Sequence, residues 1–113
     1  MTFHGVDVRR QFKRMRELAP EAYRAFLEFD GKVFAPGALD SKTKELIALG
    51  IAHNTQCPWC IDVHTVKATK AGATDKELGE VIFVSMALAA GAAWSHGGLM
   101  LQCLDEHESA KKA

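Results

Sequence analysis

Apolar residues recur at three- and four-residue intervals through most of the chain, which is the repeat of an amphipathic α-helix. The first helix is predicted over residues 7–18, where these positions form one face: Val8, Phe12, Met15 and Leu18. Pro20 suits the first turn of a second helix, which we expect to reach about Asp30. Gly31 and the segment 35–37 then interrupt the pattern.

A third helix is expected to begin at a cap provided by Asp40 or Ser41 and to reach about Asn54. Its apolar residues leave almost no polar face: Leu46, Ile47, Ala48, Leu49, Ile51 and Ala52. A helix that is apolar nearly all round is typically buried. The glutamate near its start, Glu45, therefore needs an explanation.

The second half of the chain is predicted to hold three more helices. Residues 58–71 form the fourth, and the capping box at 74–77 opens a fifth that runs through about Ala90. Gly91 is expected to break the pattern before a last helix at about 93–108. Because no segment alternates with period two, we expect one all-α domain of about six helices over residues 1–113.

Composition and charge are those of an ordinary globular protein. Hydrophobic residues make up 48% of the 113 residues, and 14 Lys and Arg balance 14 Asp and Glu. A net charge of zero argues against a general polyanion binder, so we expect no nucleic-acid partner. Near the start, five basic residues fall on the first helix, and we interpret them as a solvated face rather than an anion or acidic-partner site: Arg9, Arg10, Lys13, Arg14 and Arg16.

Neither a signal peptide nor a membrane span is expected. The first ten residues lack an apolar run between a basic start and a cleavage site. The longest apolar run, residues 81–94, is interrupted by Ser85 and is too short for a bilayer core of about 30 Å. We therefore expect a cytoplasmic protein. Since cytosolic thiols are kept reduced, a close cysteine pair there indicates catalysis, redox sensing or metal binding rather than a structural staple.

The candidate chemistry lies between Glu45 and His64, where Cys57 and Cys60 are separated by two residues. No strand is predicted before the pair, so the context is not thioredoxin-like. A thiol at a helix start meets the positive end of the helix dipole and free N–H groups, which favour the nucleophilic thiolate. Cys60 and His64 are four residues apart and share a helix face, and an imidazole beside a thiol can remove its proton.

Glu45 can join this group if the chain forms a helical hairpin at the turn 54–56. In an antiparallel hairpin closed there, Glu45 lies about as far before the turn as His64 lies after it. We therefore predict a relay in which Glu45 orients His64, His64 accepts the Cys60 proton, the Cys60 thiolate attacks and Cys57 resolves.

Two other interpretations of the cysteine pair remain open. The thiols could be inert and buried, or they could be half of a structural zinc site. Such a site needs four ligands, with His64 as the third and Glu45 or His53 as the fourth. The sequence has no second Cys-x-x-Cys pair. We favour redox chemistry, with no metal.

Other side chains are weaker candidates for the same pocket. His53, four residues before Cys57, could face it, and His96 could reach it from the last helix, although a capping or core role fits His96 better. Trp59 is interpreted as a lid or interface aromatic. Cys103, at an apolar helical position, is expected in the core.

The pattern Glu-x11-Cys-x2-Cys-x3-His, formed here by Glu45, Cys57, Cys60 and His64, resembles the alkylhydroperoxidase D-like group of the carboxymuconolactone decarboxylase superfamily. The resemblance implies that Cys60 forms the sulfenic acid and that Cys57 is the proton donor and resolving thiol. The pair would then cycle through a disulfide. Typical members carry a further histidine between the two cysteines, where this chain has Trp59. The true decarboxylases lack the cysteine pair, which argues against lactone decarboxylation.

The resemblance covers about residues 41–97 and implies a peroxidase that reduces organic hydroperoxides or hydrogen peroxide. An external dithiol protein would restore the thiols, and short members are similar to subunits of trimers or hexamers. No organic cofactor is expected, because the chain has no glycine-rich phosphate loop. Two alternatives stay open: a general disulfide reductase or redox-sensing interaction protein, and a decarboxylase-type lyase that uses His64 or His53.

Overall fold

The computed structural model describes Gly5 and residues 7–112. The expected loose lead-in at residues 1–5 therefore lies, apart from Gly5, outside the described part of the chain. The described residues form no strand, and the all-α prediction is confirmed. Five helices follow one another along the chain: α1 (Arg9–Leu18), α2 (Pro20–Phe34), α3 (Ser41–Thr55), α4 (Pro58–Lys70) and α5 (Asp75–Lys112).

Two predicted helix starts are confirmed by their hydrogen bonds. The Asp40 carboxylate caps α3 by accepting from the Thr43 backbone N–H at 2.8 Å. At the start of α5, the Glu77 N–H donates to Thr74 Oγ1 at 3.1 Å, and the Thr74 N–H donates to Glu77 Oε1 at 2.9 Å. This reciprocal pair is a capping box, so both ends follow from the local sequence.

Two predicted helix ends are wrong. The second helix continues beyond Asp30 and through Gly31 to Phe34. The expected break at Gly91 does not occur, so the predicted fifth and last helices are one 38-residue helix, α5. A glycine in a helix interior costs only about 1 kcal/mol relative to alanine, and strong helix formers flank Gly91 with no proline nearby.

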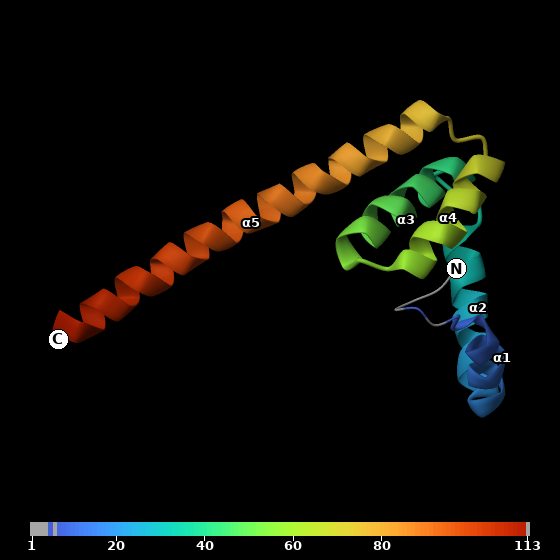
Figure 1. Cartoon of the computed structure of the whole chain (residues 1–113), viewed down its shortest axis with the longest axis horizontal. Helices are drawn as coiled ribbons and strands as arrows, with labels where there is room; N and C mark the ends of the chain where they lie inside the picture. The colour runs from blue at the N-terminus through green and yellow to red at the C-terminus, as the bar shows by residue number, and fades with distance from the viewer. Residues whose placement is uncertain (1–4, 6, 113) are drawn as a thin grey trace.

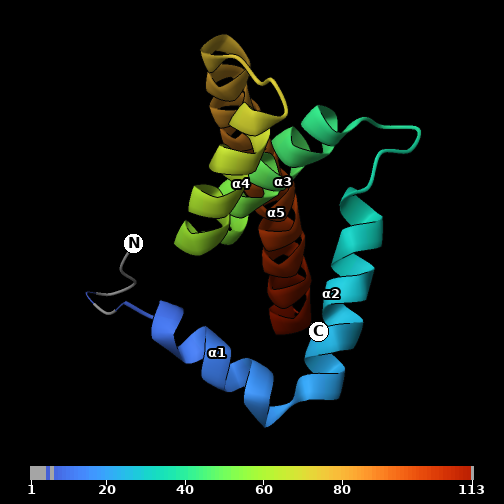
Figure 2. The same ribbon diagram turned by 90° about the vertical axis from the view of Figure 1, so that its right-hand side faces the viewer.

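The helices do not form a compact globule (Figures 1 and 2). Helices α3 and α4 make an antiparallel pair, and the first half of α5 packs against α3. The second half of α5 projects beyond the other helices, while α1 and α2 extend on the opposite side (Figure 1). The radius of gyration is 19.9 Å, compared with about 13 Å for a compact domain of this length.

Few side chains are buried within the chain. The buried hydrophobic residues of the described part are Leu49 and Ala52 at 3% exposure and Ala68 at 0%. They lie where α3 and α4 face each other. The expectation that α3 is buried all round is wrong, because Ile47 and Ile51 on its other side are 46% and 59% exposed.

Helix α5 is long and apolar. Its most apolar 18-residue window has a mean hydropathy of 1.5 and is 6% buried. By length and composition alone such a helix could cross a membrane, although a helix that packs against other protein has the same character. The apolar run at residues 81–94 lies inside this continuous 38-residue helix, so its short length no longer argues against a span.

Candidate active site

The turn between α3 and α4 determines where the cysteine pair lies. Gln56 has left-handed backbone angles (φ 56°, ψ 51°), and its N–H donates to the Ala52 carbonyl. The Cys57 N–H also donates to Ala52 O, at 3.1 Å. A left-handed residue with these bonds ends a helix and reverses the chain direction. As a result α4 returns along α3, and Cys57 lies directly before its first residue.

Cys57 is the N-cap of α4, and Pro58 follows in the first turn. The Cys57 sulfur accepts a hydrogen bond from the Cys60 N–H at 3.2 Å. The two sulfurs are joined as a disulfide, with the Cα atoms 5.3 Å apart, and both residues are half-buried. The pair thus lies where the helix dipole and free backbone N–H groups favour negative charge on sulfur.

The predicted proximity of Glu45 and His64 is confirmed. Glu45 Oε2 lies 2.6 Å from His64 Nδ1, and the side chains are 9% and 18% exposed. This partner explains how a carboxylate can be buried on α3. When the carboxylate accepts from Nδ1–H, Nε2 is left as the free ring nitrogen. His64 is one helical turn after Cys60 on α4, so the acid, imidazole and sulfur pair all belong to the α3–α4 hairpin.

Aromatic residues from α1 and α2 also reach this hairpin. Phe34, the last residue of α2, stacks on His64 with ring centroids 5.2 Å apart and planes 24° apart. Phe12 of α1 meets Trp59 edge to face at 4.8 Å. Neither phenylalanine is predicted at the site from the sequence, since a pattern of apolar helical positions does not say which neighbour each one contacts.

The other candidates are not brought to the cysteine pair by any described contact. His53 Nδ1 contacts the Leu49 carbonyl oxygen at 2.7 Å, and His96 Nδ1 contacts the Ala92 carbonyl oxygen at 2.8 Å. His96 lies exposed on the projecting half of α5, so neither a cap nor a core role describes it. Cys103 is also exposed, and the prediction that it is a core residue is wrong.

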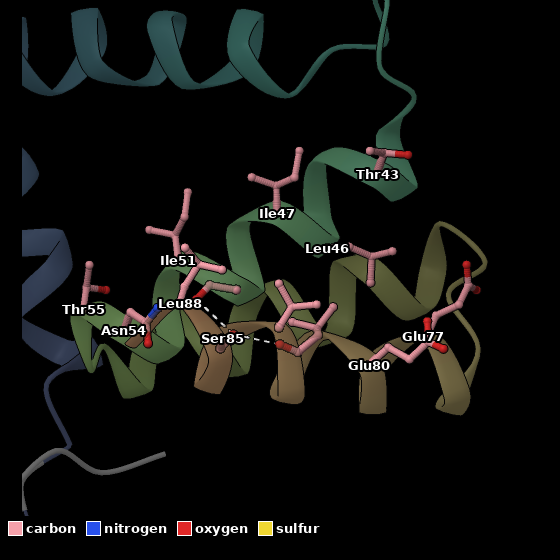
Figure 3. A pocket seen from close by; sticks show the side chains of 13 residues that line it. Thr43, Leu46, Ile47, Ile51, Asn54, Thr55, Glu77, Glu80, Ser85 and Leu88 are labelled. Atoms are coloured by element: carbon pink, nitrogen blue, oxygen red, sulfur yellow. Dashed lines mark hydrogen bonds between the residues drawn. The ribbon is translucent and has the colours of Figure 1, made fainter. Parts of the chain in front are cut away.

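Two further observations concern what the chain could bind. Within the described residues, no three His, Cys, Asp or Glu side chains are grouped so that they could hold a metal ion. An apolar groove of about 610 Å³ runs between α3 and α5 (Figure 3). Ser85 lies at its floor and donates to Gly50 O at 3.3 Å. None of the four motif residues lines this groove.

Comparison with known proteins assigns the chain to a family. Residues 20–99 match the model of the carboxymuconolactone decarboxylase family. The chain belongs to this family. It is 49% identical over 86 residues to uncharacterized protein 4 in the cox locus of Paracoccus denitrificans, covering 76% of this chain and 78% of that one.

The family assignment extends to solved structures. A carboxymuconolactone decarboxylase family protein from Legionella pneumophila is similar over 73% of each chain, with a TM-score of 0.68 and 36% identity. A more distant similarity is to an alkyl hydroperoxide reductase of Mycobacterium tuberculosis, 36% identical over 67 residues. That match covers 54% of this chain and 19% of the other.

Proposed function

We propose that this member of the carboxymuconolactone decarboxylase family is a thiol-dependent peroxidase that reduces hydroperoxides through a Cys57–Cys60 cycle. The observation that carries the proposal is one hairpin with a redox-capable cysteine pair at a helix start and a buried Glu45–His64 contact one turn further on. The similarity to an alkyl hydroperoxide reductase supports the same chemistry.

The cycle begins with the reduced pair. His64 accepts the Cys60 proton, and the thiolate attacks the terminal peroxide oxygen. The O–O bond breaks, Cys60 becomes a sulfenic acid, and the alkoxide leaves as an alcohol after protonation, or as water from hydrogen peroxide. The Cys57 thiol then condenses with the sulfenic acid, forming the disulfide and releasing water. Glu45 orients the imidazole and supports its protonated form.

An external dithiol protein closes the cycle by thiol–disulfide exchange, taking up the oxidising equivalents of the disulfide. Such a cycle needs a compartment that returns disulfides to thiols, and we place it in the cytoplasm. The half-buried position of both cysteines leaves them within reach of a partner thiol.

A stopped-flow experiment with the reduced protein and cumene hydroperoxide tests the function. A Cys103→Ser background removes the exposed third cysteine from the count. We expect two thiols per chain to be lost, one alcohol to be formed, and a sulfenic acid to be trapped by dimedone in Cys57→Ser. Peroxide consumption that persists in Cys60→Ser would contradict the proposal.

The same measurement separates the alternatives. A general disulfide reductase would exchange with protein disulfides but would not lose thiols faster when peroxide is added. A decarboxylase-type lyase using His64 or His53 would retain its activity in a Cys57→Ala/Cys60→Ala double variant. The cysteine pair favours thiol chemistry over the lyase, and the similarity to an alkyl hydroperoxide reductase favours the peroxidase over a general disulfide reductase.

We also propose that copies of the chain associate through α5, as trimers or hexamers. The chain exposes 8933 Å², whereas a compact protein of 12.4 kDa exposes about 6,100 Å². The excess of roughly 2,800 Å² is well above the roughly 800 Å² that each partner buries in a standard interface. Large apolar side chains stand exposed along the projecting half of α5: Trp94, Leu99, Met100, Leu101 and Leu104.

A second copy suits this surface better than a bilayer. The apolar surface includes the groove between α3 and α5, whose lining is largely apolar and forms a pocket that a second copy would cover (Figure 3). Polar side chains also interrupt α5 at Ser85, Ser95 and His96, and an intramembrane polar residue is costly unless it faces other protein.

A further inference from the structure

Phe34 covers one face of the imidazole in the proposed relay. The two rings are stacked, 5.2 Å apart between centroids and 24° from parallel. Phe34 is half-buried and ends α2, while His64 belongs to α4, so the contact joins two helices that share no other described interaction. Phe34 and His64 are far apart in the sequence, so the contact depends on how α2 and α4 are placed in the fold and not on either helix alone.

A lysine on α3 holds the backbone on both sides of Phe34. Lys44 Nζ donates to the Val33 carbonyl at 2.7 Å and to the Ala35 carbonyl at 2.6 Å. These are carbonyls at the C-terminal end of α2, where the helix has no internal donors left and a cation is favourable. Lys44 directly precedes Glu45, so adjacent residues of α3 hold Phe34 and His64.

The imidazole needs both restraints to have one orientation. The hydrogen bond to Glu45 fixes the position of Nδ1 but leaves the ring free to turn about that bond, because the last torsion of a histidine side chain is broad. A stacked aromatic ring restricts this rotation and keeps water from one face. With the plane set, Nε2 has a single direction, and small errors in the direction of a reacting group cost large factors in rate.

We propose that Phe34, held by Lys44, is a positioning residue that fixes the ring plane of His64 so that Nε2 serves the Cys60 thiol. The inference rests on the proposed thiol chemistry. Phe34 and Lys44 orient the base, and they do not take part in the reaction. Neither residue is expected to touch the peroxide.

The test uses a variant whose only cysteine is Cys60, and measures its alkylation by iodoacetamide together with the ¹⁵N spectrum of the His64 ring. Phe34→Leu should slow alkylation about fivefold, and the signals of the His64 ring nitrogens should shift or broaden because the ring takes more than one orientation. Phe34→Tyr should restore both the rate and the spectrum. Phe29→Leu, on the same helix at a residue that is 66% exposed, should change neither.

Lys44→Met provides an independent arm if Phe34→Leu does not fold. It should slow alkylation in the same direction, roughly threefold, whereas Lys32→Met, at a side chain that is 78% exposed, should not. An unchanged rate and spectrum in either Phe34→Leu or Lys44→Met would overturn the positioning role. Peroxide turnover in Cys60→Ser would instead overturn the peroxidase proposal, while the His64 spectrum would still report on Phe34.

Discussion

The α3–α4 hairpin is held by contacts within the chain, whereas helix α5 is largely exposed. The hairpin is short, begins at a carboxylate cap, turns at a left-handed residue, and buries Glu45 against His64 at 2.6 Å. Helix α5 has 38 residues, of which Ser85 is the buried one. Most of its large apolar side chains are therefore exposed in the single chain, although α5 is the more hydrophobic of the two regions.

This difference teaches that the candidate chemistry and the candidate assembly surface are separate parts of the molecule. The acid, the imidazole and the cysteine pair all come from one hairpin of one chain. Exposed apolar side chains lie along α5 and on the side of α3 that lines the groove, and others lie on α1 and α2. Changes in one region should therefore leave the properties of the other largely intact, and four experiments test that separation.

The largest effect is expected from Glu45→Gln. The amide keeps the shape but loses the charge that orients and supports His64, and groups in this supporting position are typically worth about 10- to 100-fold. We expect the reaction of Cys60 with peroxide to slow by that factor while the oligomeric state, measured by analytical ultracentrifugation, stays the same. Glu28→Gln, at an exposed residue of α2, is the matched control. Equal rates in both variants would remove Glu45 from the relay.

The reciprocal change is Met100→Glu on the projecting half of α5, where the side chain is 66% exposed. A charge buried in an apolar interface should weaken association by about 30-fold or more, as substitution at an interface hot spot does. The peroxide rate per chain should change little. Gln102→Glu is the control on the same helix. Two results together would contradict association through α5: a wild-type chain that floats with lipid vesicles, and sedimentation that does not change with protein concentration. They would indicate that α5 binds a bilayer instead.

A smaller effect tests the contact between the two regions. A Cβ added at Gly50 would lie 3.7 Å from Ser85 Oγ and 3.9 Å from Val81 Cγ1, which is ordinary van der Waals contact. Gly50→Ala should therefore raise the free energy of unfolding by about 0.5–1 kcal/mol, because alanine loses less backbone entropy in a helix. Urea denaturation measures it. Gly91→Ala is the control, because a Cβ there would meet open space, and it should raise the free energy of unfolding by a similar amount. If Gly50→Ala alone lowers the free energy of unfolding, α3 and α5 approach each other too closely for an added methyl group.

The smallest effect is the pH dependence of the two helix caps. Hydrogen bonds from Thr43 lower the pKa of Asp40, and bonds from Thr74 and Lys42 lower the pKa of Glu77. Because the unfolded chain then binds more protons, the stabilisation is present above the ordinary values of 3.8 and 4.5 and is lost as pH falls through the lower folded values. Thermal unfolding of Asp40→Asn, which caps without titrating, should show a shallower acid loss than the wild type.

Local sequence determined the parts of this protein whose partners are close along the chain. The caps at Asp40 and at Thr74 each use a partner three residues away, so they were predicted correctly. The proximity of Glu45 and His64 could also be predicted, since a single turn between two helices leaves little freedom in how they return. The spacing of Glu45 and His64 around the turn thus contained the geometry of their contact.

Tertiary structure decided what depends on contacts between distant segments. Whether Ile51 or Cys103 is buried depends on which surfaces meet, and an apolar period predicts a face without naming its partner. The stacking of Phe34 on His64 belongs to the same class. Hydrophobic burial is non-directional, so pattern alone cannot choose among neighbours, whereas hydrogen-bonded caps and turns are directional and local.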